Sequence, residues 1–270
     1  MLLANLKRYI ILNDIIGVFK KGVIYMDIEN TQKELLKIIN DFDKICSKHN
    51  IWYMLVGGSV LGAVRHEGFI PWDPDIDVFV KNKDLKKIRS ILKEELPQYY
   101  NYIEWDKEEG YSLPFDRLGY KEIPHQKLHM DIFPIIGAPT NKVVRKIFTK
   151  ICFLTYKANH CKYVDIKYAN PKNIGSILRL KKIFRFIPGF IFKNTFYILS
   201  NLFDFKKAKY YYTIGTGYGF KGSMQKEIIM ETEKFPFENL MLPIPKYWDE
   251  YLTNMYGDYM TPVKEGFKKV

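Results

Sequence analysis

Two aspartates separated by one residue, Asp75 and Asp77, are the residues of this sequence best placed to do chemistry. Residues two apart on a strand share a face and lie about 6.6 Å apart along the backbone. Carboxylate oxygens are the ligands that Mg²⁺ prefers, so the pair predicts a site for Mg²⁺ or Mn²⁺. A solvent-facing edge strand with alternating polarity would produce the same pattern.

A glycine-rich turn, Gly57-Gly58-Ser59, precedes the aspartates and follows an apolar run at 51–56. The first N–H groups of a helix have no partner inside the helix, and they attract anions. The turn is therefore a candidate phosphate cradle, and a strand-to-helix turn without a ligand is the alternative. A phosphate cradle beside a cation site indicates phosphoryl or nucleotidyl transfer.

The elements that must position these residues follow from hydrophobic spacing and from Gly and Pro signals. We expect helices at 31–49 (with Asn30 or Thr31 as cap), 59–65, 83–96, 142–154, 177–186, 191–205 and 246–256. We expect strands at 51–56, 75–80, 102–105, 112–118 and 128–135, and proline-broken loops at 235–238 and 242–245. Gly257 is placed to end the last helix.

This order of elements predicts an α+β fold with a small mixed sheet. We expect an N-terminal extension over residues 1–30, a catalytic core over 31–140, and a helical, basic C-terminal part over 141–270 that completes the fold. The three cysteines show no pairing pattern, which favours a reducing compartment. His160-Cys161 with Cys152 lacks the fourth ligand of a zinc site.

The net charge of +12 is concentrated in one segment. Residues 141–210 hold 16 Lys and Arg against 2 acids, so the remainder of the chain is near −2. Such a segment suits nucleic acid, anionic lipid or a polyanionic substrate, or it forms a solvated basic face. No apolar run reaches the roughly 18 residues that span a bilayer. Because no signal peptide is recognisable either, we expect a cytoplasmic protein.

The residues around the aspartates resemble the signature of the LicD family, the phosphorylcholine transferases that include fukutin-related protein. The matching residues are Gly57-Gly58-Ser59, Leu61 to His66, Gly68 to Asp73, and Asp75-Ile76-Asp77. Further blocks occur at His129, Asp131 to Pro134, Phe237-Glu238, Pro243, Pro245 and Tyr256 to Met260, so the resemblance spans about 35–262. Two departures are Pro74, where the family commonly carries an acid, and Val263, where it commonly has a second proline.

The resemblance implies a core like that of DNA polymerase β, because the family belongs to the same nucleotidyltransferase superfamily. It also implies that Asp75 and Asp77 hold the metal and that Asp131 is the third carboxylate. A third carboxylate can bind a second metal ion and take the proton of the attacking hydroxyl, which supports this role. Capping a loop at the end of a strand is the alternative for Asp131.

Further residues are candidates to serve the site, and most of them have a structural alternative. Arg65 is a candidate to neutralise a diphosphate, or it forms an ion pair with Asp73 or Glu67. We expect His66 to be structural or to orient substrate rather than to act as a general base. We expect Trp72 to pack beneath its loop, with stacking on a base as the alternative. Arg117 is a further candidate neighbour of the phosphate or metal.

The family resemblance implies transfer of a phospho-alcohol from a CDP-activated donor such as CDP-choline to a hydroxyl of a cell-surface glycan precursor, with release of CMP. Phosphocholine, ribitol phosphate and glycerol phosphate are the candidate groups. Teichoic acid, capsule and lipopolysaccharide precursors are the candidate acceptors, which suggests a lipid-linked substrate. The basic, aromatic segment 178–205 would then lie on the anionic inner face of the membrane.

Two rival functions remain open from the sequence. A true nucleotidyltransferase would move NMP to a small molecule, a protein or an RNA end. A nucleic-acid-binding protein would use the basic segment with aromatic stacking. That segment contains no recognisable binding module, and this second rival leaves the aspartate pair unexplained, so we do not expect a nucleic-acid partner.

Overall fold

A six-stranded mixed sheet forms the centre of the fold, and the computed structural model describes residues 26–261 of the chain. Five strands follow the order β1-β2-β5-β4-β3, and a sixth, β6, pairs with the second half of β5. Only β2 and β5 pair in parallel. The strands are β1 (Tyr53–Leu55), β2 (Ile76–Lys81), β3 (Tyr100–Ile103), β4 (Asp116–Tyr120), β5 (Met130–Ala138) and β6 (Tyr210–Tyr212). The predicted mixed sheet is thereby confirmed.

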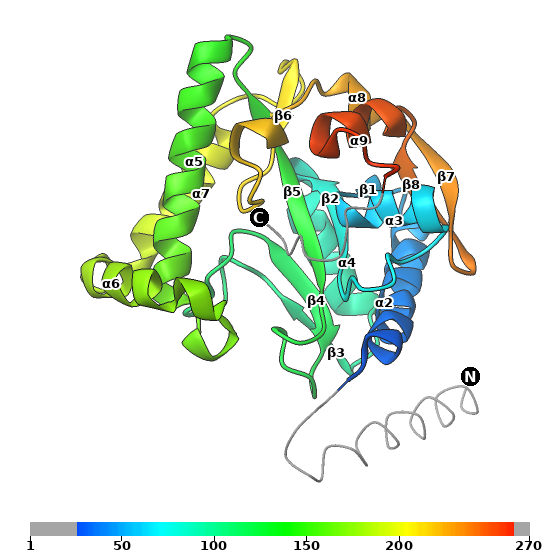
Figure 1. Cartoon of the computed structure of the whole chain (residues 1–270), viewed down its shortest axis with the longest axis horizontal. Coiled ribbons are helices and arrows are strands. Elements are labelled where there is room, and N and C mark those ends of the chain that lie inside the picture. Colours follow the sequence, from blue (N-terminus) through cyan, green and yellow to red (C-terminus); the bar gives the residue numbers. More distant parts are fainter. Residues whose placement is uncertain (1–25, 262–270) are drawn as a thin grey trace.

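Helices surround the sheet, and the long helix α5 stands at one side of it (Figure 1). The α-helices are α2 (Ile28–Lys48), α3 (Gly58–His66), α4 (Leu85–Glu95), α5 (Lys142–Tyr163), α6 (Ile174–Phe184), α7 (Gly189–Asn201), α8 (Glu227–Met230) and α9 (Trp248–Tyr256). Short 3₁₀ turns are η1 (Asn82–Asp84), η2 (Ile166–Tyr168), η3 (Pro171–Asn173) and η4 (Gly219–Gly222). Every expected helix is present, most of them with shifted ends.

Helix α2 begins earlier than the sequence suggested. Asp27 is its cap, because the Asp27 side chain accepts a hydrogen bond from the Asn30 N–H at 2.8 Å. The expected cap at Asn30 or Thr31 is therefore wrong. The expected extension over 1–30 lies outside the described residues apart from 26–30, of which 28–30 belong to α2.

The proline-rich stretches expected as loops form a hairpin instead. Strands β7 (Thr232–Phe237) and β8 (Leu240–Pro245) pair antiparallel, with Lys234 opposite Pro243 and Pro236 opposite Met241. A two-stranded ribbon consists only of edge strands, where a residue without an N–H is tolerated. This is the physical reason that proline misled the prediction.

In the central sheet, two strands lie a few residues away from their expected positions, and one strand was not expected. β4 begins only at Asp116, after the irregular stretch 112–115 that contains Pro114, and β3 ends at Ile103 rather than at 105. β6 is three residues long and follows the basic helical segment, so it carries too little periodicity for recognition.

The main hydrophobic cluster draws residues from both sides of position 140. It unites residues of α2, such as Phe42, and of β2, such as Val78, with Leu252 of α9. A second cluster joins the end of β5 to α5 and α7, with Phe148 and Phe196 at its centre. The division between a core and a C-terminal part stays a prediction. No helix within residues 26–261 is both long and apolar enough to span a bilayer.

Candidate active site

The glycine-rich turn is joined directly to the strand that carries Asp77. The Ser59 hydroxyl accepts a hydrogen bond from the Asp77 N–H at 2.9 Å, and the Val56 N–H donates to the Asp77 carbonyl at 3.1 Å. Ser59 is buried, so its hydroxyl is directed at β2 rather than at solvent. The backbone of Asp77 is therefore held on both sides, which limits the movement of its carboxylate relative to the turn.

Gly57 occupies a backbone conformation that requires glycine. Its φ is +58°, and its N–H donates to the hydroxyl of Tyr251 at 3.0 Å. The N–H of Ser59 is bonded to the Val56 carbonyl. Of the three amides predicted to cradle phosphate, only the Gly58 N–H is not used by these two bonds. A Cβ at Gly58 would lie 2.9 Å from Oδ2 of Asp73, so the absence of a side chain there also makes room for a carboxylate.

The parallel pairing of β2 and β5 brings two of the three predicted aspartates together. Asp77 and Asp131 are direct partners in the register, and Asp75 precedes β2 by one residue on the same face as Asp77. Asp131 is buried, whereas Asp75 and Asp77 are half-buried. The carboxylates thus line one edge of the sheet at the start of two parallel strands.

Arg117 on β4 holds the carboxylate of Asp131. Its Nε lies 2.6 Å from Oδ1 and its Nη2 lies 3.3 Å from Oδ2. Both side chains are almost buried, at 12% and 11% exposed. Burial lowers the pKa of Arg117, but the charge of Asp131 and its hydrogen bond, with Tyr111 and Asp77, together outweigh burial, so the pKa of Arg117 lies above its usual value. The arginine therefore remains a cation and neutralises Asp131.

The carboxylates of Asp75, Asp77 and Asp131 are the candidate ligands for a divalent cation. Within residues 26–261, no three His, Cys, Asp or Glu side chains form a ready-made metal cage, and the Asp131 carboxylate is bound by Arg117. The residues nevertheless fit Mg²⁺ or Mn²⁺, because Mg²⁺ is usually held by one or two carboxylates together with substrate phosphates. Asp75 and Asp77 would hold the ion, and Asp131 would join them when Arg117 releases it.

Arg65 and His66 lie at the C-terminal end of α3. The Arg65 Nη1 donates to the Tyr259 carbonyl at 3.0 Å, and its Nε donates to Nε2 of His66 at 3.0 Å. Burial, followed by the charge of Arg65, lowers the pKa of His66. The contacts place Arg65 against the C-terminal segment, so its predicted role at a diphosphate stays a prediction.

Trp72 does not pack beneath its loop. Its side chain is 61% exposed, and its ring lies edge-on to His66 at a centroid distance of 6.4 Å. The expected packing is therefore wrong, because the residues that bury this loop are its neighbours Phe69 and Ile70. An exposed aromatic ring beside the C-terminal end of α3 is instead available to a ligand.

The hairpin turn between β7 and β8 braces the loop after α3. The Glu238 carboxylate accepts a hydrogen bond from the Phe69 N–H at 3.1 Å, and the Glu238 N–H donates to the Glu67 carbonyl at 2.6 Å. A Cβ at Gly68 would overlap Oε1 of Glu238, so a side chain there would displace the Glu238 carboxylate. The match at Phe237-Glu238 signalled these residues in the sequence but gave them no role.

Three tyrosine hydroxyls gather at the cradle, and residue-level reasoning missed all three. Besides Tyr251, the hydroxyls of Tyr256 and Tyr218 lie 3.2 Å apart and would be 3.5 and 3.9 Å from a Cβ at Gly57. They come from α9 and from the segment before η4, about 160 residues or more after Gly57 in the chain. The block at Tyr256-Gly257 was their signal, and only the fold brings it to the turn.

Comparison with known proteins matches part of the chain to one family. Residues 50–166 match the LicD/FKTN/FKRP nucleotidyltransferase domain, which covers β1 to β5, α3, α4, α5 and the turn at η2. Residues 50–166 form a LicD-family domain.

Two named relatives extend the match. Lipopolysaccharide cholinephosphotransferase LicD of Haemophilus influenzae is 27% identical over 246 residues, which cover 87% of this chain and 92% of that protein. Human ribitol 5-phosphate transferase FKRP is 34% identical over 94 residues, or 35% of this chain and 18% of the human protein. The likeness to the bacterial relative therefore extends beyond residues 50–166.

Proposed function

We propose that this LicD-family chain transfers a phospho-alcohol from a CDP-activated donor to a hydroxyl of a cell-surface glycan precursor and releases CMP. The chain is an enzyme of the phosphotransferase class, in keeping with its family and with the two named transferases that it resembles. The observation that carries the proposal is the register pairing of Asp77 with Asp131 beside the Ser59 turn. Carboxylates that can hold a divalent cation beside a helix N-terminus suit the binding of a diphosphate.

In this mechanism the N-terminus of α3 orients the diphosphate of the donor. The acceptor hydroxyl attacks the distal phosphorus in line, the bond from that phosphorus to the bridging oxygen breaks, and CMP leaves. Asp131 takes the proton of the hydroxyl once Arg117 no longer holds both of its oxygens. A divalent ion held by Asp75 and Asp77 would neutralise charge on the phosphate oxygens.

Positioning and charge neutralisation then supply most of the catalysis, as is usual for phosphoryl transfer. We further propose that Gly57, Gly58, Ser59, Arg65 and His66 serve the donor, and that Ser59 acts by positioning Asp77. A polymerase-β-like core over residues 31–140, completed by residues 141–270, is part of the same proposal.

The decisive test is CMP release from a panel of CDP-alcohols with Mg²⁺ or Mn²⁺, in the presence and absence of glycan acceptors. We expect CMP with at least one donor, and a turnover about 100-fold or more lower in Asp77→Asn and Asp131→Asn. Glu94→Gln on α4 removes an exposed carboxylate that is not among the site residues, and it should retain wild-type turnover.

The products separate this proposal from its rivals. A phospho-alcohol on the acceptor with free CMP supports it, whereas NMP on the acceptor with free phospho-alcohol identifies a nucleotidyltransferase. Absence of CMP with every donor, or full activity in both aspartate variants, would contradict the proposal. Nucleic-acid binding by Asp75→Asn/Asp77→Asn with no catalytic activity in the wild type would favour the non-enzymatic alternative.

We also propose that the helices α5, α6 and α7 rest on an anionic membrane surface, at the inner face of the cell membrane. Their outward side chains include large apolar residues: Val143, Ile147, Ile151, Leu154, Leu178, Ile183, Phe186, Phe190, Tyr197 and Ile198 are all exposed. Basic residues are exposed among them, such as Lys182 of α6 and Arg185 directly after it. Apolar and basic side chains together are the pattern that binds anionic lipid.

A further inference from the structure

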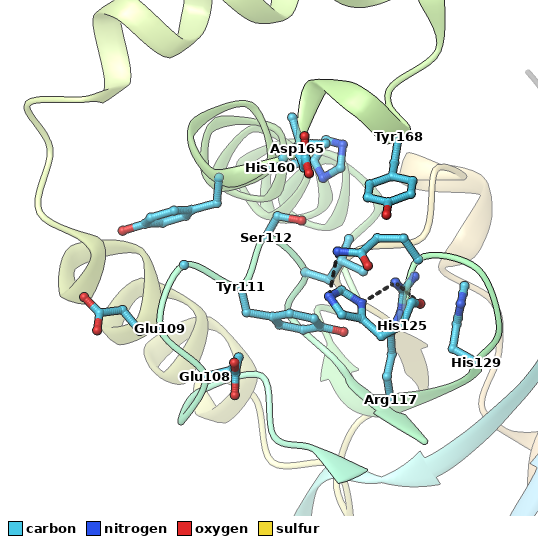
Figure 2. A pocket seen from close by; sticks show the side chains of 15 residues that line it. Glu108, Glu109, Tyr111, Ser112, Arg117, His125, His129, His160, Asp165 and Tyr168 are labelled. Atoms are coloured by element: carbon cyan, nitrogen blue, oxygen red, sulfur yellow. Dashed lines mark hydrogen bonds between the residues drawn. The ribbon is translucent and has the colours of Figure 1, made fainter. Parts of the chain in front are cut away.

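A cavity of about 310 Å³ lies beside the Arg117–Asp131 pair. We call it the Tyr111 cavity; its walls include Tyr111, Arg117, His125, His129, His160 and Tyr168. Figure 2 shows His160 and Tyr168 on one side of the space and Tyr111, His125 and Arg117 on the other. Its volume is within the range of small-molecule sites, about 300–1,000 Å³.

Three buried polar atoms of this cavity have no hydrogen-bond partner among the described residues. They are the hydroxyl of Tyr111, Nδ1 of His129 and Nδ1 of His160. Tyr111 is only 6% exposed, so its hydroxyl has left bulk water without a replacement. An unsatisfied buried polar group is costly, and such groups are rare in native proteins. Their grouping in one cavity indicates a ligand that supplies the missing hydrogen bonds.

The charges around the cavity exclude an anionic ligand. Arg117 is engaged with Asp131, and three carboxylates, those of Glu108, Glu109 and Asp165, belong to the lining residues. Burial, with the nearby charge of Arg117 among the further causes, lowers the pKa of His125 and of His160 to about 4, so both rings are neutral at pH 7. A phosphate would therefore meet carboxylates without a spare cation to bind it.

A quaternary ammonium group fits the cavity poorly as well. Such a cation donates and accepts no hydrogen bonds, so it would leave the Tyr111, His129 and His160 atoms unsatisfied. A neutral polyhydroxyl ligand meets both requirements, because each hydroxyl donates and accepts. The rings of Tyr111 and Tyr168 offer apolar faces to the C–H groups of a sugar.

The position of the cavity relative to the cradle assigns the ligand to the acceptor. Across the sheet, Asp77 pairs with Asp131, and Asp131 pairs with Arg117. The α3 cradle lies beyond Asp77, whereas the Tyr111 cavity lies beyond Asp131 on the β4 side. An in-line displacement needs the attacking and leaving oxygens on opposite sides of the phosphorus. A hydroxyl that enters from the cavity would therefore attack opposite a leaving group at the cradle, with Asp131 between them.

We propose that the Tyr111 cavity binds a neutral sugar unit of the acceptor glycan and presents its hydroxyl to Asp131. This inference rests on the proposed function for the identity of the acceptor. It rests on the cavity itself for the chemistry of the ligand.

The test uses binding rather than turnover. Ligand-observed NMR titrations of the full chain would use glucose, galactose, N-acetylglucosamine and N-acetylgalactosamine as probes, with choline and CMP for comparison. We expect at least one sugar to bind with a Kd in the millimolar range, and Tyr111→Phe to raise that Kd about 3- to 10-fold. Ser223→Ala removes another unpartnered buried hydroxyl outside the cavity, and it should leave the Kd unchanged.

The free protein supplies a second readout. Because the Tyr111 hydroxyl has no hydrogen-bond partner within residues 26–261, Tyr111→Phe should leave the Tm unchanged or raise it, which separates lost binding from lost folding. The inference is overturned if no sugar of the panel binds, if Tyr111→Phe binds the sugars as well as the wild type does, or if Tyr111→Phe weakens choline or CMP instead. Failure of the proposed function is seen in a different experiment: the wild-type chain would release no CMP from any CDP-alcohol.

Discussion

The pair formed by Arg117 and Asp131 is the residue-scale feature with the most consequence for catalysis. A buried carboxylate needs a cation nearby, and Arg117 provides it within 2.6 Å. The same guanidinium also contacts Nδ1 and the carbonyl oxygen of His125, both at 3.3 Å, which ties the Tyr111 cavity to the candidate base. Arg117 therefore links the two halves of the proposed transfer.

His160 gives a residue-scale prediction on pH. Burial, then Lys157 and Arg117, lower the pKa of His160 from 6.5 to about 4. Between pH 6.5 and 4 the unfolded chain binds a proton here that the folded chain does not, so the free energy of unfolding falls as the pH falls. His160→Gln removes this titrating group. Between pH 7 and 4 we therefore expect the free energy of unfolding of the variant to fall by about 1–3 kcal/mol less than that of the wild type.

Urea unfolding at several pH values measures this difference directly. Other groups titrate in both proteins, so the contribution of His160 is the difference between the two proteins in how the free energy of unfolding changes with pH. Parallel stability curves for the wild type and His160→Gln would show that the ring is not held neutral by its surroundings.

At the scale of elements, the hairpin and the last helix act on the cradle from a distance in sequence. The turn after β7 contacts the loop after α3 through Glu238, and α9 contacts the glycine-rich turn through Tyr251, whose hydroxyl accepts the hydrogen bond from Gly57. Residues from the last quarter of the chain thus define the shape of a turn near residue 57. A LicD-family domain that ended at residue 166 would lack these braces.

Glu238→Ala tests the brace. The substitution removes the acceptor for the Phe69 N–H, and an unsatisfied buried amide costs about 1–3 kcal/mol, so we expect chemical denaturation to show a loss within that range. Transfer activity should also fall under conditions in which the variant is still folded, because the loop after α3 loses the hydrogen bond that holds it. Glu233→Ala on β7 removes an exposed carboxylate of the same hairpin and serves as the matched control. Equal behaviour of the two variants would rule out the brace.

At the scale of the whole molecule, exposed apolar residues are concentrated on α5, α6 and α7, which lie together at the left of Figure 1. On α5 the exposed residues Val143, Ile147, Ile151 and Leu154 recur at helical spacing, so they form a stripe. Large exposed apolar patches mark interaction surfaces. The positive charge of the same segment favours an anionic membrane as the partner.

Flotation with vesicles of anionic lipid tests this surface. Each basic residue near an anionic surface contributes about 1 kcal/mol, so Lys182→Glu/Arg185→Glu should weaken binding at least tenfold. Phe186→Ser/Phe190→Ser should weaken it at both low and high salt, because apolar contacts are not screened. Lys83→Glu/Lys86→Glu reverses two exposed charges at η1 and α4 and should bind as the wild type does. No flotation of the wild type, or equal flotation of all variants, would contradict a membrane role.

The sequence by itself determined the local features of this protein. It identified the turn at 57–59, the strand with Asp77, most helices and the LicD-family resemblance, because these depend on residue spacing within short segments. Gly257 at the end of α9 was predicted correctly for the same reason, since its φ of +75° suits glycine. Proline-rich strands and the exposure of Trp72 were predicted wrongly, because edge position and burial depend on neighbours.

Only the tertiary structure decided which distant groups meet. Asp77 and Asp131 became neighbours through the parallel register of β2 and β5, and Arg117 reached Asp131 through β4. The Tyr251 contact to Gly57 joins residues 194 positions apart. Hydrogen bonds and ion pairs between distant segments leave no periodic signal in a single sequence. They form because burial of the shared core fixes the strands in one register, and the side chains at the sheet edge then have defined partners.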